Sequence, residues 1–309
     1  MMYASLPKAI VTLCFLSSFF ILNAQNKTFF LQPKWTKGET HRFELTKGKH
    51  VIKNNQQSTE NESRQIVTVS VVEATTKGYL VAAVYENTFG SNESVEVRYT
   101  IGQNGDFQGI VNMRDVQKTF YSIFDNLTAI AASNPSVAKS VGEMRQLMTS
   151  DNYVTYNYFQ ELTLIHQFYN NTFTVDSLER YETQLPNLFD PKGKPFNAQA
   201  TLLAKCDNSV AYIRHTVEPD MQGIKQQAAH FMNRMSGSNS SKWSVDIQPT
   251  SPLSRRVYDS MEAQNEYIFD ENFCAFNLKT GWLTAFQRKR TILENDVKTV
   301  EFVFLKEIK

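Results

Sequence analysis

Cysteine is scarce in this chain of 309 residues, which contains only Cys14, Cys206 and Cys274. So few cysteines exclude a disulfide-rich scaffold and leave no cysteine pairs with the spacing of a structural zinc site. Cys14 lies inside an apolar N-terminal run, so only Cys206 and Cys274 are candidates for pairing. They either form one disulfide in an oxidising compartment or stay as buried thiols, and the sequence leaves both alternatives open.

Excess charge of either sign is also absent. The chain has 32 Lys and Arg against 31 Asp and Glu, and Lys8 is the only charged residue among the first 24. Binding to nucleic acid or to an anionic membrane surface requires a concentrated positive field. The sequence therefore predicts no nucleic-acid partner.

Most local signatures of catalysis and metal binding are missing. The five histidines show neither i, i+4 pairing nor an H-E-x-x-H arrangement, and there is no G-x-S-x-G or glycine-rich phosphate loop. We therefore predict no metal and no cofactor, and nothing marks the chain as an enzyme. A carboxylate pair for glycoside hydrolysis stays open, because tertiary distance defines such a pair.

Three short motifs match the letters of a catalytic set. Ser136–Lys139, Ser150–Asn152 and Lys279–Gly281 spell the S-x-x-K, S-D-N and K-T-G motifs of serine β-lactamases. In that family a large helical region separates the first two motifs, whereas here ten residues lie between Lys139 and Ser150. This spacing favours ordinary helix-surface and turn residues over an acyl-transfer site.

Only one long apolar run is present, and it lies at the N-terminus. Lys8 precedes the apolar stretch Ala9–Leu22, and Asn23-Ala24 provides a small residue before Gln25. This pattern predicts a signal peptide over residues 1–24 with cleavage after Ala24. A run of 14 residues is too short to span the bilayer, which needs about 20. We therefore expect a periplasmic or extracellular protein without a transmembrane segment in the mature chain.

The remaining chain, residues 25–309, is predicted to form a single α+β domain. Strand patterns of period two fill residues 26–111, with a turn at Thr76–Gly78 and an exposed loop at Lys53–Ser63. Apolar residues at helical spacing predict a helical insert over about 112–169 and a second helix over about 219–235. Strands are expected again over 178–217 and from about Val257 to the C-terminus. This order favours an antiparallel sheet, strongly curved or a half-open barrel, with the helices on its concave face.

Aromatic and methionine side chains gather on the predicted helices. A curved sheet covered by such helices can enclose an apolar cavity, although a filled core is the alternative. The expected ligand is an apolar small molecule or a lipid. The residues predicted to line its cavity are Phe120, Phe124, Tyr158, Leu162, Phe231 and Met235.

Two resemblances agree with this reading. The signal ending in Asn23-Ala24-Gln25 and the segments Tyr267–Asp270 and Lys279–Leu283 resemble exported Gram-negative proteins of unknown function. The order of strands and helices is similar to that of the periplasmic lipoprotein carriers, which are shorter half-barrels that shelter acyl chains beneath a helical lid. The second resemblance implies an acyl-chain ligand by analogy of fold.

An interaction protein is the alternative function. Its outer surface would bind a glycan or a protein partner, with Trp35, Trp243 or Trp282 stacking on that partner. The run Arg288–Arg290 is predicted to be a solvated strand face or a protected sheet edge, because basic residues there discourage strand addition.

Overall fold

The computed structural model describes residues 27–53, 56–86, 94–131, 135–187, 193–235, 267–294 and 297–308. The predicted signal peptide, Trp243 and the expected strand start at Val257 lie outside these described residues. Where the chain is described again, a strand begins at Tyr267.

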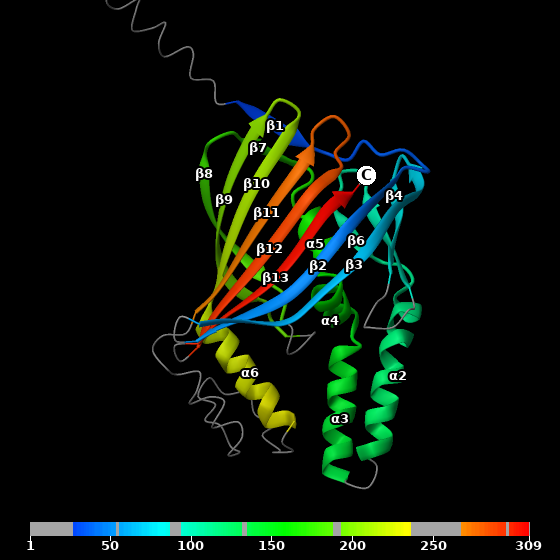
Figure 1. The fold of residues 1–309 in the computed structure, drawn as a ribbon, viewed down its shortest axis with the longest axis vertical. Coiled ribbons are helices and arrows are strands. Elements are labelled where there is room, and N and C mark those ends of the chain that lie inside the picture. The colour runs from blue at the N-terminus through cyan, green and yellow to red at the C-terminus, as the bar shows by residue number, and fades with distance from the viewer. Residues whose placement is uncertain are drawn as a thin grey trace, which may run out of the picture.

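The described part of the chain is dominated by one sheet of 11 strands in which every neighbouring pair is antiparallel (Figure 1). In spatial order the strands are β6 (Phe107–Ile110), β5 (Val95–Gly102), β4 (Gly78–Tyr85), β3 (Gln56–Thr75), β2 (Thr40–Lys53), β13 (Val297–Ile308), β12 (Leu283–Glu294), β11 (Tyr267–Asn277), β10 (Val210–Pro219), β9 (Phe196–Asp207) and β8 (Leu178–Leu185). A separate pair joins β1 (Thr28–Leu31) to β7 (Asn171–Thr174). The C-terminal strand thus lies at the centre of the sheet, beside β2.

Alternation of apolar and polar residues accounts for these strands. Val67, Val69 and Val71 of β3 are all buried, as are Val97 and Tyr99 of β5. The turn before β4 ends at Gly78, whose φ of 138° is disfavoured for other residues. A Cβ there would also run into the carbonyl oxygen of Ile101. The period-two prediction and the Thr76–Gly78 turn are both confirmed.

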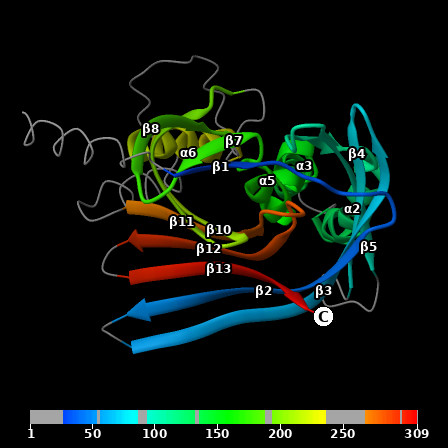
Figure 2. The same cartoon turned by 90° about the horizontal axis from the view of Figure 1, so that it is seen from above.

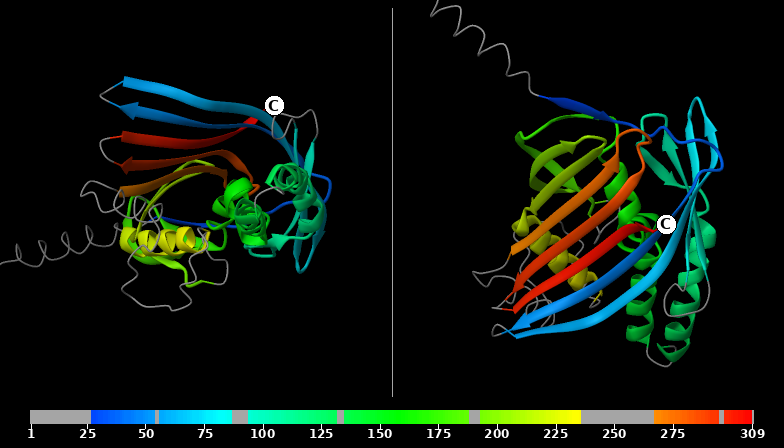
Figure 3. Two further views of the ribbon diagram at one scale, coloured as in Figure 1. Left: turned by 90° about the horizontal axis from the view of Figure 1, so that it is seen from below. Right: turned by 45° about the horizontal axis from the view of Figure 1, so that its top comes forward.

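The helices follow the predicted change of period. They are α2 (Met113–Ala131), α3 (Pro135–Met148), α4 (Asp151–Tyr153), the π-helix η2 (Val154–Tyr158), α5 (Gln160–His166) and α6 (Met221–Met235). The Ser150 side chain caps α4 by accepting from the Tyr153 amide at 3.3 Å. Helices α2 and α3 lie side by side (Figure 3), and α2, α3 and α5 lie on one side of the sheet (Figure 2).

The coarse fold class is therefore confirmed as α+β with an antiparallel sheet. The sheet is open in the described residues, because β6 and β8 form its two edges and do not pair with each other. Neither closure nor strong curling of the sheet is shown, so the half-open barrel stays a prediction. We call the face that packs against α5 the inner face.

The segment that follows β1 links distant parts of the fold. Its backbone hydrogen bonds reach the turn after β11, through Lys34 N–H to the Thr280 carbonyl at 3.1 Å, and β3, through Gly38 N–H to the Val71 carbonyl at 2.9 Å. Trp35 lies between these two anchors and is buried. The segment therefore holds one indole ring against the core.

One predicted element is wrong in type. Residues Lys53–Ser63 are predicted to form a loop, but β2 continues to Lys53 and β3 begins at Gln56, so the described residues of this range belong to two long paired strands. The paired register runs from Lys53 opposite Gln56 to Lys47 opposite Ser63. On the β3 strand of this hairpin arm the side chains described for residues 56–63 are exposed, which is why its polar composition resembles that of a loop, whereas residues 47–52 on the β2 strand are half-buried.

Among the described residues, no helix combines the length and the apolar character needed to cross a membrane.

Candidate functional site

The structure gives positions for the six residues that were predicted to line a cavity. Phe120 and Phe124 of α2 are buried, and the Phe120 ring stacks on Tyr158 of η2 with centroids 4.2 Å apart. Leu162 of α5 is buried as well. Phe231 and Met235 belong to α6, but their side chains lie outside the described residues. The prediction that all six line one ligand cavity stays a prediction.

An apolar cavity of about 40 Å³ lies between α5 and the inner face of the sheet. Leu162 and Ile165 of α5 form one wall, and side chains of β2, β3, β4 and β5 form another. The lining also includes Leu283 of β12, Leu305 of β13, three further aromatic residues, Trp35, Tyr169 and Trp282, and two polar residues of α5, Glu161 and His166. Among the four predicted site residues whose side chains the structure describes, Leu162 lines this cavity and Phe120, Phe124 and Tyr158 do not.

Trp35 lines the cavity and is buried in the core. Its ring stacks on Trp282 with centroids 4.4 Å apart, and its indole N–H is buried with no hydrogen-bond partner in the described structure. A buried N–H without a partner is unfavourable, and such a group marks a place for a water or a ligand atom. Trp282, in contrast, donates its indole N–H to Glu39 at 3.0 Å.

The expected surface role of these tryptophans is wrong for two of them. Trp35 and Trp282 are only 6% and 4% exposed. Aromatic rings stabilise the fold most when they are removed from water, and here the two rings stack inside the core. Neither ring is available to a glycan on the surface.

Glu161 places a carboxylate at the cavity wall, although its side chain is only 1% exposed. Its two oxygens lie 3.1 and 3.2 Å from Lys47 Nζ, which also donates to the Tyr158 carbonyl at 2.9 Å. Burial and the neighbouring Glu161 carboxylate raise the pKa of Tyr85 well above its usual value. Moving a charge into the interior is costly unless it is paired, so this ion pair fixes α5 to β2.

His166 contributes a neutral ring. Its Nδ1 lies 3.2 Å from the Gly105 carbonyl oxygen, which can only accept, so Nδ1 carries the proton. Burial lowers the pKa of His166 to about 4. His166 is therefore a core residue whose Nδ1 proton has a hydrogen-bond partner.

Polar side chains form two parallel rows across the inner face, next to the apolar cavity. The strand registers align them on β10, β11, β12, β13 and β2. The first row contains His215, Asn272, Arg288, Val303 and Lys47, and the second contains Val217, Asp270, Arg290, Glu301 and Lys49. We call the polar members of both rows the polar band. A third row flanks the first row on the side away from the second. It is apolar and contains Ile213, Cys274, Phe286, Leu305 and Leu45.

Asp270 is the centre of the polar band. It accepts two hydrogen bonds from Arg290, both of 2.7 Å, and two longer ones of 3.4 Å from Arg288. Burial alone would raise the pKa of Asp270, but the hydrogen bonds and charges of the two arginines lower it. Arg288 also donates to Gln160 of α5. The carboxylate is therefore ionised and holds two guanidinium groups at the inner face.

The prediction for Arg288–Arg290 is thus wrong. Strand β12 lies between β11 and β13, so it is not a sheet edge. The Arg288 side chain is only 9% exposed. Arg288 and Arg290 alternate with Lys289 and share the face of buried Phe286, so they point inward instead of toward solvent.

His215 and Asn272 form an incompletely satisfied pair. They are cross-strand partners, and both are buried. His215 Nε2 lies 2.9 Å from the Tyr181 hydroxyl, but His215 Nδ1 and Asn272 Oδ1 have no partner in the described structure. Burial lowers the pKa of His215 to about 4, although Asp270 opposes this shift. Two such atoms on adjacent strands fit a water or hydroxyl that accepts from one and donates to the other.

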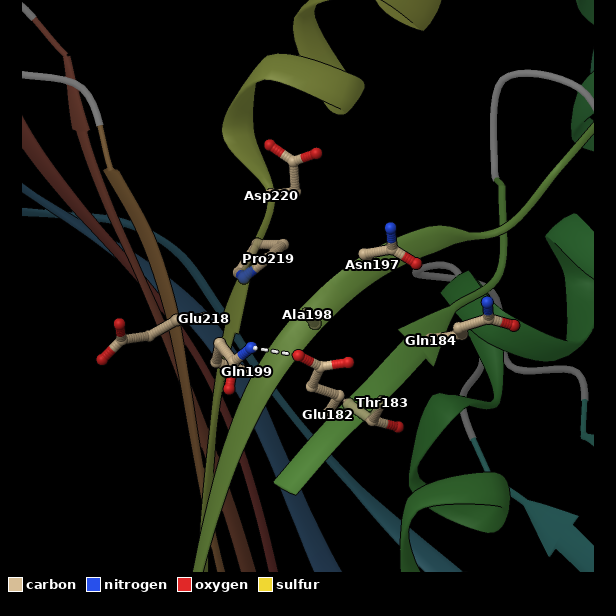
Figure 4. A pocket seen from close by; sticks show the side chains of 9 residues that line it. All are labelled: Glu182, Thr183, Gln184, Asn197, Ala198, Gln199, Glu218, Pro219 and Asp220. Carbon is tan, nitrogen blue, oxygen red and sulfur yellow. Dashed lines mark hydrogen bonds between the residues drawn. The ribbon is translucent and has the colours of Figure 1, made fainter. Parts of the chain in front are cut away.

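A larger hollow of about 690 Å³ lies at the ends of β8, β9 and β10, but it has the character of open surface. It includes Glu182, Glu218 and Asp220, whose carboxylates point apart in Figure 4. Gln199 donates to Glu182 at 3.5 Å, which is a weak contact. The described residues contain no cluster of three or more side chains able to hold a metal ion. We assign no chemistry to this hollow.

The remaining sequence motifs have structural explanations. Cys206 and Cys274 are free thiols. Lys139 Nζ lies 4.0 Å from Glu143 Oε1, one helical turn further along α3. Ser150 is the N-cap of α4. Lys279–Gly281 belongs to the turn between β11 and β12. None of these contacts places a lysine beside a serine nucleophile.

Comparison with models of known protein families finds none that matches this chain. Comparison with curated proteins likewise finds no match.

Proposed function

We propose that this chain is an exported binding module for an apolar ligand, which it holds between α5 and the inner face of the sheet. The observation that carries the proposal is the apolar cavity, whose lining includes Trp35, a buried residue with an unpartnered indole N–H. A mostly apolar pocket with a few polar groups is the usual form of a small-molecule site. Export follows from the signal-peptide pattern of residues 1–24.

We also propose that the sheet acts as a half-open barrel around α5. This helix contacts both β6 and β12, which are six places apart in the strand order. Neighbouring strands are about 4.8 Å apart, so a flat sheet would separate β6 and β12 by roughly 29 Å. A helix is only about 10 Å across, so contact with both strands favours a sheet that bends around α5. The same arrangement supports the similarity to the lipoprotein carriers.

The ligand needs more space than the cavity now provides. About 40 Å³ suits one or two water molecules, whereas ligand sites usually measure about 300–1,000 Å³. We propose that the segment from α4 to α5 shifts to admit the ligand. In support, η2 breaks the α-helical hydrogen-bond pattern, and Phe159 at the junction has a φ of −122°. Such π-helical turns are frequent at functional sites.

The outer face of the sheet supports a second candidate function, partner binding. Phe273 of β11 and Phe304 of β13 both pair with Gln287 and are 38% and 36% exposed. Phe273 also stacks on Tyr212 with centroids 6.1 Å apart. Exposed aromatic rings that lie close together are typical of interaction surfaces.

Filling the cavity is expected to block ligand binding. The wild-type protein should bind N-phenyl-1-naphthylamine, an uncharged apolar fluorescent probe, and Leu162→Phe should weaken this binding at least fivefold because the larger ring occupies the cavity. Fluorescence titration measures the dissociation constant.

Leu31→Phe is the matched control, because Leu31 is equally buried but does not line the cavity. Each substitution overpacks the core and should cost about 1–3 kcal/mol of stability. Equal weakening by both variants, or no binding of the probe by the wild type, would contradict the proposed function and favour partner binding by the outer face.

A further inference from the structure

A cleft of about 260 Å³ lies on the inner face beside the apolar cavity. Its charged and amide side chains are Lys47, Lys49, Asn61, Gln160, Arg288 and Glu301. Two consecutive residues of α5 separate the two spaces: Gln160 binds Arg288 in the cleft, and Glu161 lines the cavity while it binds Lys47. The cleft and the cavity therefore lie on either side of the start of α5.

Three cations and one carboxylate face this cleft. The carboxylates that pair with the cations, Glu161, Glu60 and Asp270, are not part of its lining. The Lys49 pair with Glu60 spans 3.4 Å between side chains that are 42% and 47% exposed. Exposed pairs of this kind are weak, so Lys49 is available to an anion.

We propose that the ligand is an anionic amphiphile, whose phosphate or carboxylate lies in this cleft and whose apolar chain lies in the cavity. This inference rests on the proposed function. Ammonium and guanidinium groups together with an amide N–H are the donors that proteins use for phosphate and carboxylate. On the inner face, the apolar row that contains Phe286 and Leu305 lies directly beside the first row of the polar band, which contains Arg288. An amphiphile has the same arrangement, with an apolar chain next to a charged head group.

The test compares ligands that share one chain and differ in the head. Calorimetric titration at low ionic strength would use decanol, decyl phosphate and decyltrimethylammonium below their aggregation concentrations, and inorganic phosphate alone. Decyl phosphate should bind at least tenfold more tightly than decanol, and decyltrimethylammonium more weakly than decanol. Raising the salt concentration should reduce the preference for decyl phosphate.

Two substitutions in the cleft should act in opposite directions. Lys49→Gln should reduce the preference for decyl phosphate over decanol by about three- to tenfold, and Glu301→Gln should increase it by a similar factor. Neither should change the affinity for decanol. Lys289→Gln removes the same charge from the opposite face of β12 and is the matched control.

Each pattern of results has its own meaning. Equal affinity for decanol and decyl phosphate overturns the anionic head group but leaves the proposed function intact. Failure of all three decyl compounds overturns the proposed function. If inorganic phosphate binds as tightly as decyl phosphate, the cleft is a site for a free anion, and the link to the apolar chain is wrong.

Discussion

Replacing Asp270 by asparagine is expected to lower the free energy of unfolding by about 3–5 kcal/mol. The carboxylate holds Arg288 and Arg290 at the inner face, and the side chains of Asp270 and Arg288 are only 8% and 9% exposed. An amide retains the shape of the carboxylate but removes its negative charge. The two guanidinium groups then face each other without their buried counter-charge, and only the exposed Glu301 carboxylate beside Arg290 remains, which is the costly way to break a buried ion pair. Urea denaturation followed by circular dichroism measures the loss.

Glu271 provides a control on the next residue of the same strand. It points to the opposite face, where it accepts from Arg214 Nε at 2.7 Å, and the Arg214 side chain is 58% exposed. Because exposed pairs contribute little, Glu271→Gln should cost less than about 1 kcal/mol. If Asp270→Asn costs no more than Glu271→Gln, the polar band does not hold the inner face together.

Local patterns were sufficient to predict most elements of this fold. Val67, Val69 and Val71 of β3 alternate with Thr68 and Ser70, and the change from period two to helical spacing at residue 113 marks the start of α2. These signals are local because the burial of one face imposes them on neighbouring residues. The order of strands along the chain also indicates an antiparallel sheet, since short turns join most successive strands.

The β2–β3 arm could not be predicted in this way. Residues 56–64 pair with β2 but have no alternation of apolar and polar side chains, because the side chains described among them are exposed on both faces of the strand. What stabilises it is backbone hydrogen bonding in register with β2, a non-local property. A polar strand wetted on both faces has the composition of a loop.

The polar band was missed for a different reason. Its rows take single residues from five strands, so the pairing of Asp270 with Arg290 depends on strand register. One local signal was present, since Phe286, Arg288 and Arg290 share a strand face and Phe286 is an evident core residue. An inward-facing arginine requires a buried carboxylate, and that reasoning would have predicted a partner such as Asp270.

Mild acid is expected to destabilise the protein through two buried histidines. Burial lowers the pKa of His166 and of His215 to about 4, from an ordinary value of 6.5. Between these values the unfolded chain binds protons that the folded chain does not, so the free energy of unfolding falls as pH decreases from about 6.5 toward 4. At pH 5 the loss is roughly 2 kcal/mol for each ring. Asp270 acts at lower pH, because its lowered pKa contributes stability that is lost only below its ordinary value of 3.8.

Glutamine at both positions removes the titration while keeping an amide that can donate to Gly105 or to Tyr181. Urea midpoints measured from pH 4.5 to 7.5 should therefore depend much less on pH for the double variant His166→Gln/His215→Gln than for the wild type. The pH dependence of each single variant should lie halfway between these two. The comparison isolates the two rings, since every other titrating group is shared. A double variant with the same pH slope as the wild type would show that neither ring is held neutral by burial, and the inner face would then be open to water at His215.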